Sequence, residues 1–406
     1  MNDSANIGQP LERLQKTALA VGAVAAVLSL LAALTDFEAF SKSYLMAFVF
    51  WLGLPLSCLA FLMLHNLVGG RWSFFIRRQL EAGSRTLPAF VIFFIPVGLA
   101  VSATHIYEWA HYVVGGGDAI LDHKSGYLNQ TFFYLRTAGS FIIWIGLAVL
   151  LNKWSAQQDR KGADGSLVAR MNFVSGPGIV IYFLTVTLLA VDLLMSLDPH
   201  WFSTIYALIY IIGQALLTLS FLVLITRRLA ECEPLRAVAS PQRFHELGNF
   251  MLAFVMLWAY LSVSQLLIIW SANLPEVNPW YVTRFQDPWA TMGFIILIFH
   301  FAVPFLLLLW RSTKRRPNLL RNVALGLIFM RLVELFWVIK PSMDPSAEAS
   351  FAPLSLATDL VTWAALGGLW IYLFLAQLKK RSLLPVNDPR LPHEFVQKLS
   401  AKRAEA

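Results

Sequence analysis

Long apolar segments recur ten times along the chain, and polar loops separate them. A helix needs about 20 apolar residues to cross a hydrocarbon core about 30 Å thick. By this measure the pattern predicts transmembrane helices at residues 17–34, 44–68, 87–104, 131–151, 177–197, 203–226, 246–271, 287–310, 322–340 and 354–378. We therefore expect an all-α integral membrane protein with ten transmembrane helices.

Two other segments carry local patterns. Residues 71–83, RWSFFIRRQLEAG, mix aromatic and basic side chains, which favours a short helix along the membrane surface, with a solvated loop as the alternative. The connection 105–130 holds three of the eight histidines and a triple glycine. This connection either contacts an extramembrane subunit or site entrance, or is a simple turn.

The composition agrees with a membrane protein, because 57% of the 406 residues are hydrophobic and only 14% are charged. A soluble chain carries about 25% charged residues. The formal net charge of +8 would suit a nucleic-acid-binding protein, but the basic residues lie in short loops between the apolar segments. We therefore expect no nucleic-acid partner.

The distribution of basic residues predicts the orientation of the chain. Most of the 32 Lys and Arg residues lie in loops on the side of the N-terminus, and few lie on the other side (Lys42, Lys124, Arg284 and Lys340). The positive-inside rule then places both termini in the cytoplasm. No small-residue cleavage site follows the first apolar run, so we expect this run to remain as a span.

Two matching segments indicate an internal repeat. VDLLMSLDP (191–199) and VELFWVIKP (333–341) each place an acid seven residues before a proline, after Val and before Leu. A duplicated four-helix unit predicts two pseudo-repeated four-helix bundles, residues 44–197 (spans 2–5) and 203–340 (spans 6–9). Residues 1–43 with the first span, the last span 354–378 and a basic tail 379–406 would flank the bundles.

Ionisable residues inside the spans mark the candidate site, because each costs at least about 2.5 kcal/mol in hydrocarbon. Asp192 has no basic residue in its own helix, so it is protonated, paired across helices with a residue such as Arg136, or open to water. Glu334 follows Arg331 by three residues, so the two form either part of a proton relay or a neutralised pair without function. Asp359 lies a turn inside the last span and either joins the relay or reaches the interface.

The histidines and cysteines narrow the chemistry further. His300 lies near the centre of its span, where it serves a proton relay or only bonds to a neighbouring helix. His65 lies about ten ångströms away in depth, which disfavours a shared haem. His105 and His111 lack a recognised zinc spacing, and the cysteines Cys58 and Cys232 are too few for a cluster, so we expect no metal site.

Four long segments carry a resemblance to a known family: WLGLPLSCLAFLMLHNLVGGRWSFFIRRQLEAGSRTLP (51–88), SGPGIVIYFLTVTLLAVDLLMSLDPHWFSTIYALIYIIGQ (175–214), FHELGNFMLAFVMLWAYLSVSQLLIIWSANLPEVNPWY (244–281) and FHFAVPFLLLLWR (299–311). They resemble the F subunit of bacterial alternative complex III. The resemblance spans residues 40 to 380 and implies a membrane anchor of the polysulfide-reductase type, multi-pass in the bacterial inner membrane.

The resemblance also implies partners and cofactors. The expected partners are a homologous quinol-oxidising membrane subunit, an iron-sulfur protein, multihaem cytochrome c subunits, small helical subunits and lipids. Haem and iron-sulfur clusters are expected in those partners only, since this chain carries no motif for them. A quinone, either menaquinone or ubiquinone, is the one cofactor expected at this chain, and nothing is expected to be bound covalently.

These inferences predict a membrane subunit of a quinol:cytochrome c or cupredoxin oxidoreductase, with no redox centre of its own. The expected proton pathway comprises Asp192, Glu334, Arg331, His300, Asp359 and Arg136, with His65 and Glu246 near a cytoplasmic entrance. Tyr260, Ser264 and Gln265 are candidate quinone-binding residues. The alternatives are a structural anchor for the sister subunit without its own chemistry, and a proton-coupled transporter.

Overall fold

The computed structural model describes residues 8–162, 164–344 and 347–397; the outermost parts of the expected segments 1–43 and 379–406 lie outside these ranges. Throughout the described residues the regular structure is helical, with no strand. Ten helical segments there are long and apolar enough to cross a membrane: Leu11–Thr35, Phe37–Val68, Arg71–Ala103, Gln130–Lys161, Gly165–Leu197, Tyr206–Leu229, Pro241–Ala272, Trp289–Leu309, Pro317–Met343 and Pro353–Leu378. The prediction of an all-α chain with ten candidate spans is confirmed.

The long elements are α1 (Gly8–Thr35), α2 (Phe37–Val68), α7 (Gln130–Lys161), α8 (Gly165–Leu193), α9 (Tyr206–Leu229), α11 (Pro241–Ala272), α16 (Pro317–Met343) and α18 (Pro353–Leu378). Three spans are composite, and the fifth joins α8 and the short turn η2 (Met195–Leu197). The third joins α3 (Arg71–Ser84), α4 (Leu87–Phe93) and α5 (Ile95–Ala103), and the eighth joins α13 (Trp289–Ile296), the π-helical turn η3 (Leu297–Ala302) and α14 (Val303–Leu309).

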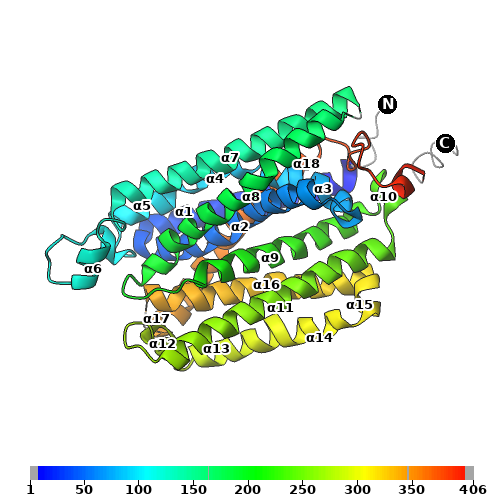
Figure 1. Cartoon of the computed structure of the whole chain (residues 1–406). Helices are drawn as coiled ribbons and strands as arrows, with labels where there is room; N and C mark the ends of the chain where they lie inside the picture. Colours follow the sequence, from blue (N-terminus) through cyan, green and yellow to red (C-terminus); the bar gives the residue numbers. More distant parts are fainter. Residues whose placement is uncertain (1–7, 163, 345–346, 398–406) are drawn as a thin grey trace.

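Short elements connect the spans. They are η1 (Glu108–Ala110), α6 (Ala119–Lys124), η2 (Met195–Leu197), α10 (Leu235–Val238), α12 (Pro279–Arg284), α15 (Arg311–Arg315) and α17 (Ala347–Phe351). The start of α1, α3, α15 and the tail 379–397 gather at one end of the bundle, here called the terminal face (Figure 1). The opposite face carries α6, α12 and α17.

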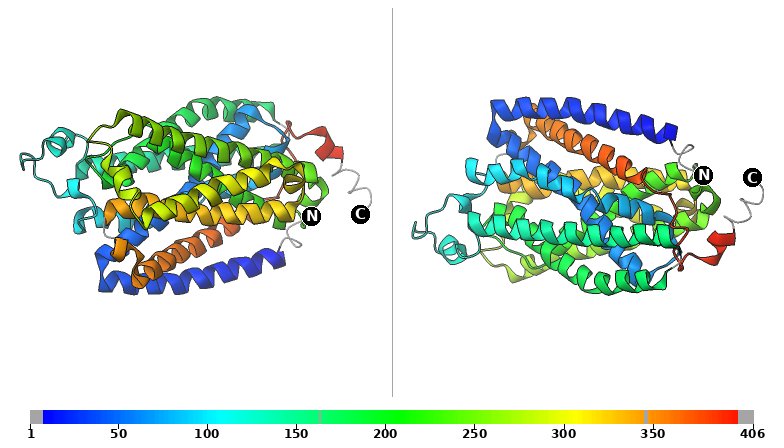
Figure 2. Two further views of the ribbon diagram at one scale, coloured as in Figure 1. Left: turned by 90° about the horizontal axis from the view of Figure 1, so that it is seen from below. Right: turned by 90° about the horizontal axis from the view of Figure 1, so that it is seen from above.

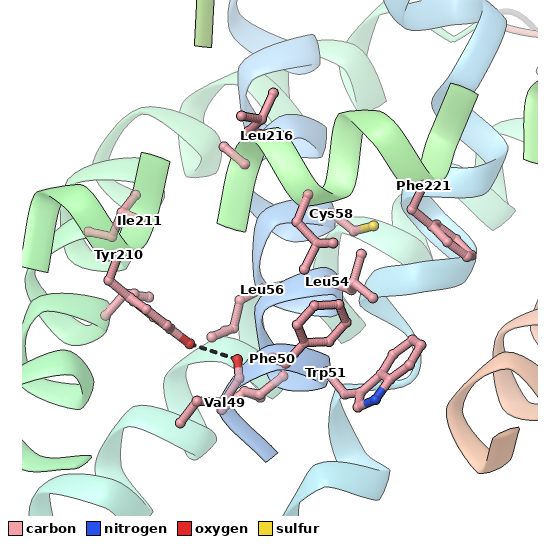
Figure 3. Packing of buried hydrophobic residues seen from close by; sticks show 14 of the residues in the cluster. Val49, Phe50, Trp51, Leu54, Leu56, Cys58, Tyr210, Ile211, Leu216 and Phe221 are labelled. Carbon is pink, nitrogen blue, oxygen red and sulfur yellow. Dashed lines mark hydrogen bonds between the residues drawn. The ribbon is translucent and has the colours of Figure 1, made fainter. Parts of the chain in front are cut away.

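Helix α2 forms the centre of the molecule. It packs against α1, α3, α8, α9, α16 and α18, and nearly all its side chains from Phe40 to Met63 are buried. Figure 3 shows this core, in which Val49, Trp51 and Leu54 of α2 face Tyr210 and Phe221 of α9. Helix α2 is apolar all around its axis, which is typical of a helix that is buried among other helices.

Eight of the spans pack in two groups, and α2 belongs to the first while it also contacts α9 and α16 of the second. One group contains α2, the α3–α5 segment, α7 and α8, and the other contains α9, α11, the α13–α14 segment and α16 (Figure 1). Helices α1 and α18 lie side by side along one flank (Figure 2). Gly22 and Gly368 allow this close approach, since a Cβ on Gly368 would lie 2.5 Å from the Cα of Gly22.

Helix α3 differs from its expected place on the membrane surface. Every residue from Trp72 to Ser84 is buried between other elements, so the surface-helix prediction is wrong. The charged side chains are tolerated there because they pair. Glu81 accepts hydrogen bonds from Arg77 at 3.1 Å, Arg78 at 2.7 Å and Arg381 at 3.1 Å.

The described part of the tail folds back over the terminal face. Asp388 is buried and pairs with Arg77 of α3 and, at 3.0 Å, with Arg390. Glu394 pairs with Arg243 of α11. These ion pairs attach the tail to both groups of helices.

The connection 105–130 forms a loop around η1 and α6 at the face opposite the terminal face. Asp118 caps α6, and its second carboxylate oxygen lies 2.6 Å from the Nε2 atom of His200. The hydrogen bond from His200 is the largest cause of a lowered Asp118 pKa. The rings of His105 and His111 are 4.9 Å apart. In the described part of the chain, no three His, Cys, Asp or Glu side chains are grouped so that they could hold a metal ion.

Candidate functional site

Three of the predicted relay residues meet on the inner side of the second helix group. Arg331 and Glu334 lie one turn apart on α16, and Arg331 Nη1 donates to Glu334 Oε2 at 2.5 Å. His300, on the π-helical turn η3, places Nε2 3.5 Å from the same oxygen. All three side chains are at most 3% exposed. The arrangement places a titratable carboxylate between a guanidinium and an imidazole.

A fourth member of this cluster was not expected from the sequence. Trp258 of α11 donates its indole N–H to Glu334 Oε1 at 2.8 Å, and its ring lies edge-on to His300 at 4.4 Å. Its place two helical turns before Gln265, on the same face of α11, was the available signal. Neither ring nitrogen of His300 has a hydrogen-bond partner within the described residues. His300 therefore retains the capacity to bind water or a ligand.

A glycine makes room for the arginine of the cluster. A Cβ on Gly213 of α9 would lie 2.2 Å from Arg331 Nη1, so no larger residue fits without moving the guanidinium. Arg331 Nη2 also donates a hydrogen bond to the carbonyl oxygen of Tyr210 at 3.4 Å. Helix α9 thus positions Arg331 through its backbone.

A cavity of about 370 Å³ lies beside this cluster. Its walls come from α9, α11, α12, α13 and α16, near the opposite face of the bundle. Eight of the lining residues are aromatic: Tyr206, Trp258, Trp280, Tyr281, Phe285, Phe294, Phe301 and Trp337. Val263, Phe285 and Phe294 on its rim are at least 49% exposed, which places the mouth on the lipid-facing side of α11 and α13.

A few polar groups line the same cavity. Glu334 contributes its carboxylate, and Gln265 accepts from Ser203 at 2.8 Å and donates to the Tyr281 hydroxyl at 3.2 Å. Arg284 stacks on the Trp280 ring at 3.6 Å and donates to the Val338 carbonyl at 2.6 Å. An apolar cavity with few convergent polar groups is the usual form of a small-molecule site.

Only one of the three predicted quinone residues reaches the cavity. Gln265 lines it, whereas Tyr260 is 67% exposed and Ser264 is outside the lining. Trp258, Ser262 and Gln265 share a face because they are spaced by four and three residues on α11. Tyr260 and Ser264 lie on other faces of the helix, which residue type alone did not reveal.

Asp192 is paired across helices with Arg136, which was one of the three alternatives expected from the sequence. Arg136 of α7 binds it with two donors, Nε and Nη2, each 2.9 Å from a carboxylate oxygen. The guanidinium also covers the Tyr127 ring at 3.8 Å. This bidentate geometry neutralises an acid that is 2% exposed.

The remaining relay candidates lie apart from the cavity. Asp359 of α18 lies buried, 2.8 Å from the Lys340 ammonium of α16. His65 is buried with Nδ1 2.6 Å from Ser73 Oγ, and Glu246 accepts from Arg243 at 2.7 Å. Among the described residues, no hydrogen bond or ion pair joins His65 or Glu246 to Glu334.

Comparison with known proteins adds no assignment. The chain matches no protein-family model, and it has no detectable similarity to a curated protein. The interpretation of the site therefore depends on its geometry and on the resemblance of the four segments.

Proposed function

We propose that this chain is the membrane subunit of a quinol:electron-acceptor oxidoreductase, and that the cavity beside Glu334 binds a quinone head group. The observation that supports this most is the cavity with the buried Glu334 carboxylate in its wall, a carboxylate that pairs with Arg331 and lies 3.5 Å from His300. A quinone ring stacks on aromatic side chains, and its two carbonyl oxygens accept hydrogen bonds. The acceptor would be a cytochrome c or a cupredoxin.

Proton chemistry gives the cluster its role in this proposal. Oxidation of a quinol releases two protons with two electrons, and charge does not accumulate in hydrocarbon. Glu334 and His300 would accept a proton beside the cavity, while Arg331 stabilises the carboxylate. Asp192, Arg136, Asp359, His65 and Glu246 would extend the path through water. The redox centres would belong to iron-sulfur and cytochrome partners beside a homologous membrane subunit.

The proposal includes the finer topology expected from the sequence. Both termini would lie in the cytoplasm of a bacterium, and the two helix groups would be copies of one four-helix unit. Corresponding contacts support the repeat. Asp192 on the fifth span faces Arg136 of the fourth, and Glu334 on the ninth span faces His300 of the eighth. Each acid thus faces a basic residue on the preceding span.

Quinone binding is tested by closing the cavity. Ser262→Phe fills it from α11, and Ser271→Phe places the same side chain at an exposed position of the same helix. A quinone analogue should quench the fluorescence of the purified full chain, because Trp258, Trp280 and Trp337 line the cavity. We expect Ser262→Phe to weaken this quenching at least about tenfold, and Ser271→Phe to leave it unchanged. Equal quenching in both variants would rule the cavity out.

A structural anchor is the second candidate function. The closed pairs Asp192–Arg136 and Asp359–Lys340 favour it, since each neutralises a buried charge without a ligand. In the assembled complex, Glu334→Gln separates the two functions. The anchor predicts unchanged rates of quinol oxidation and proton release, whereas the proton path predicts that both rates fall together.

A further inference from the structure

The short helix α15 and the residue that follows it bring four basic residues together at the terminal face, between α14 and α16 (Figure 1). Arg311, Arg315 and Arg316 are exposed, and Lys314 is 7% exposed. Helix α15 packs on the first turns of α11, where His245 lies within electrostatic range of Arg311, Lys314 and Arg315. The four residues Arg311, Lys314, Arg315 and Arg316 are here called the α15 cluster. They lie in the connection between α14 and α16.

Among the described residues, the α15 cluster has no anionic partner, unlike six arginines of the same face. Carboxylates pair with Arg71, Arg77, Arg78, Arg243, Arg381 and Arg390. By contrast, no described carboxylate lies within ion-pair distance of Arg311, Lys314, Arg315 or Arg316; the nearby Glu246 is bound by Arg243. Cations held close together repel one another, so this arrangement favours an anion from outside the chain.

Lys314 is held in place rather than extended into solvent. Its stem crosses Gly248 of α11, where an added Cβ would lie 2.7 Å from Lys314 Cγ. Burial lowers the pKa of the Lys314 ammonium. One turn from Gly248, the Nδ1 atom of His245 is buried without a hydrogen-bond partner. A fixed ammonium and an unpartnered imidazole nitrogen therefore face the same side of α11.

The surface beside the cluster is apolar. Trp310, which precedes α15, is 65% exposed, and Leu306 and Leu309 of α14 are 59% and 50% exposed. Tryptophan at a span end typically marks the headgroup level of a bilayer. The cluster therefore combines a cationic site at headgroup depth with a path for acyl chains along α14.

We propose that the α15 cluster binds the headgroup phosphate of an anionic phospholipid. Arginine and lysine donate charge-assisted hydrogen bonds to phosphate oxygens, and the phosphodiester supplies the missing negative charge. His245 contributes a further polar contact, and Trp310 and Leu309 contact the glycerol and acyl region. The lipid would fix the α14–α15–α16 turn against α11.

Native mass spectrometry of the purified full chain tests this proposal. The chain is equilibrated with equal amounts of phosphatidylglycerol and phosphatidylcholine of identical acyl chains. We expect the wild type to retain phosphatidylglycerol preferentially, and each neutralised cation to lower the preference about fivefold. The first variant is Arg315→Gln, at an exposed position where the change leaves the packing intact. The second is the triple variant Arg311→Gln/Lys314→Gln/Arg315→Gln. Gly248→Val keeps all charges but displaces Lys314, and should also lower the preference.

Arg160→Gln is the matched control. Arg160 is exposed in the last turn of α7, has no described ion-pair partner, and follows a span that runs in the same direction as α14. It should retain the wild-type preference. An equal loss in Arg160→Gln, equal retention of phosphatidylcholine by the wild type, or displacement of the lipid by inorganic phosphate at low millimolar concentration would each overturn the proposal.

Discussion

At the scale of single residues, the membrane interior of this protein tolerates charge because nearly every buried charge has a partner. Glu334 has Arg331, Trp258 and His300, Asp192 has Arg136, and Asp359 has Lys340. A buried pair is often no more stable than well-packed apolar residues, but one unpaired member is strongly destabilising. Stability alone therefore does not explain why these buried pairs are present, which makes them candidates for a functional role.

A double-mutant cycle on Arg331 and Glu334 tests this view. Arg331→Met leaves the carboxylate unpaired, and Glu334→Gln leaves the guanidinium unpaired, so each should destabilise the chain by about 3–5 kcal/mol. The double variant should recover much of this loss, because neither charge remains. Unfolding of the purified chain in detergent measures all three. Additive losses would show that the two side chains do not interact.

Gly213 allows a cleaner test of how Arg331 is positioned. Gly213→Ala should displace the guanidinium and destabilise the chain by about 1–3 kcal/mol, because its Cβ would lie 2.2 Å from Nη1. Gly326→Ala on α16 is the control, since a Cβ there meets nothing within 4 Å. It should be neutral or stabilising by up to about 1 kcal/mol. Thermal unfolding of both variants distinguishes steric crowding from a general effect of replacing glycine.

At the scale of elements, packing between helices depends on local shape more than on hydrophobicity. Lipid is as apolar as leucine, so helices associate where small residues allow close contact. Helices α1 and α18 approach at Gly22 and Gly368, and α3 fits against α2 where Cys58 lies over Gly83. The π-helical turn η3 changes the direction of side chains within one span and turns His300 toward α16.

Substitution of Gly368 should loosen the flank formed by α1 and α18. A Cβ there would lie 2.5 Å from the Cα of Gly22 in α1. The atoms that it would meet are backbone atoms, which cannot move away as a flexible side chain can. We expect Gly368→Ala to destabilise the chain by about 1–3 kcal/mol. Gly139→Ala, at an open position of α7, serves as the control. Cysteine crosslinking between α1 and α18 should become less efficient in Gly368→Ala alone.

At the scale of the whole molecule, the tail 379–397 connects the two groups of helices. Arg381 binds Glu81 in the first group, Asp388 binds Arg77, and Glu394 binds Arg243 in the second group. The terminal face is therefore closed by a network of ion pairs. Such a network responds to pH when its acids titrate.

Docking of the tail should weaken in acid. Burial alone would raise the pKa of Asp388, but Arg390 and Arg77 outweigh it and lower this pKa from 3.8 to about 2. Because the pKa is lower in the folded state, the stabilisation is complete above pH 3.8 and is lost as the pH falls toward about 2. Hydrogen exchange in residues 379–397, corrected for intrinsic rates, should rise across this interval.

Asp388→Asn gives the matching test. The variant should show faster exchange in the tail at neutral pH and a smaller change between pH 4 and pH 2 than the wild type. Glu276→Gln, which replaces an exposed acid outside the network, should behave as the wild type. An unchanged pH response in Asp388→Asn would show that other acids control the tail.

The order of apolar and polar segments determined the ten candidate spans, because a bilayer demands helices of a minimum length and apolarity. The rarity of charge within those spans also identified Glu334, Arg331, His300 and Asp192 as candidates, and the structure then showed that they are buried. Spacing along one helix predicted the Arg331–Glu334 pair, since residues three apart share a face.

Only the tertiary structure decided which residues meet across helices. Trp258, Arg284 and Gln265 come to one cavity from α11 and α12, and Tyr260 points elsewhere, because rotation of a helix about its axis depends on its neighbours. Burial of α3 beneath the tail likewise depends on Asp388 and Arg381, about 300 residues distant in sequence. A sequence reports which groups avoid lipid, but the packing of the helices selects their partners.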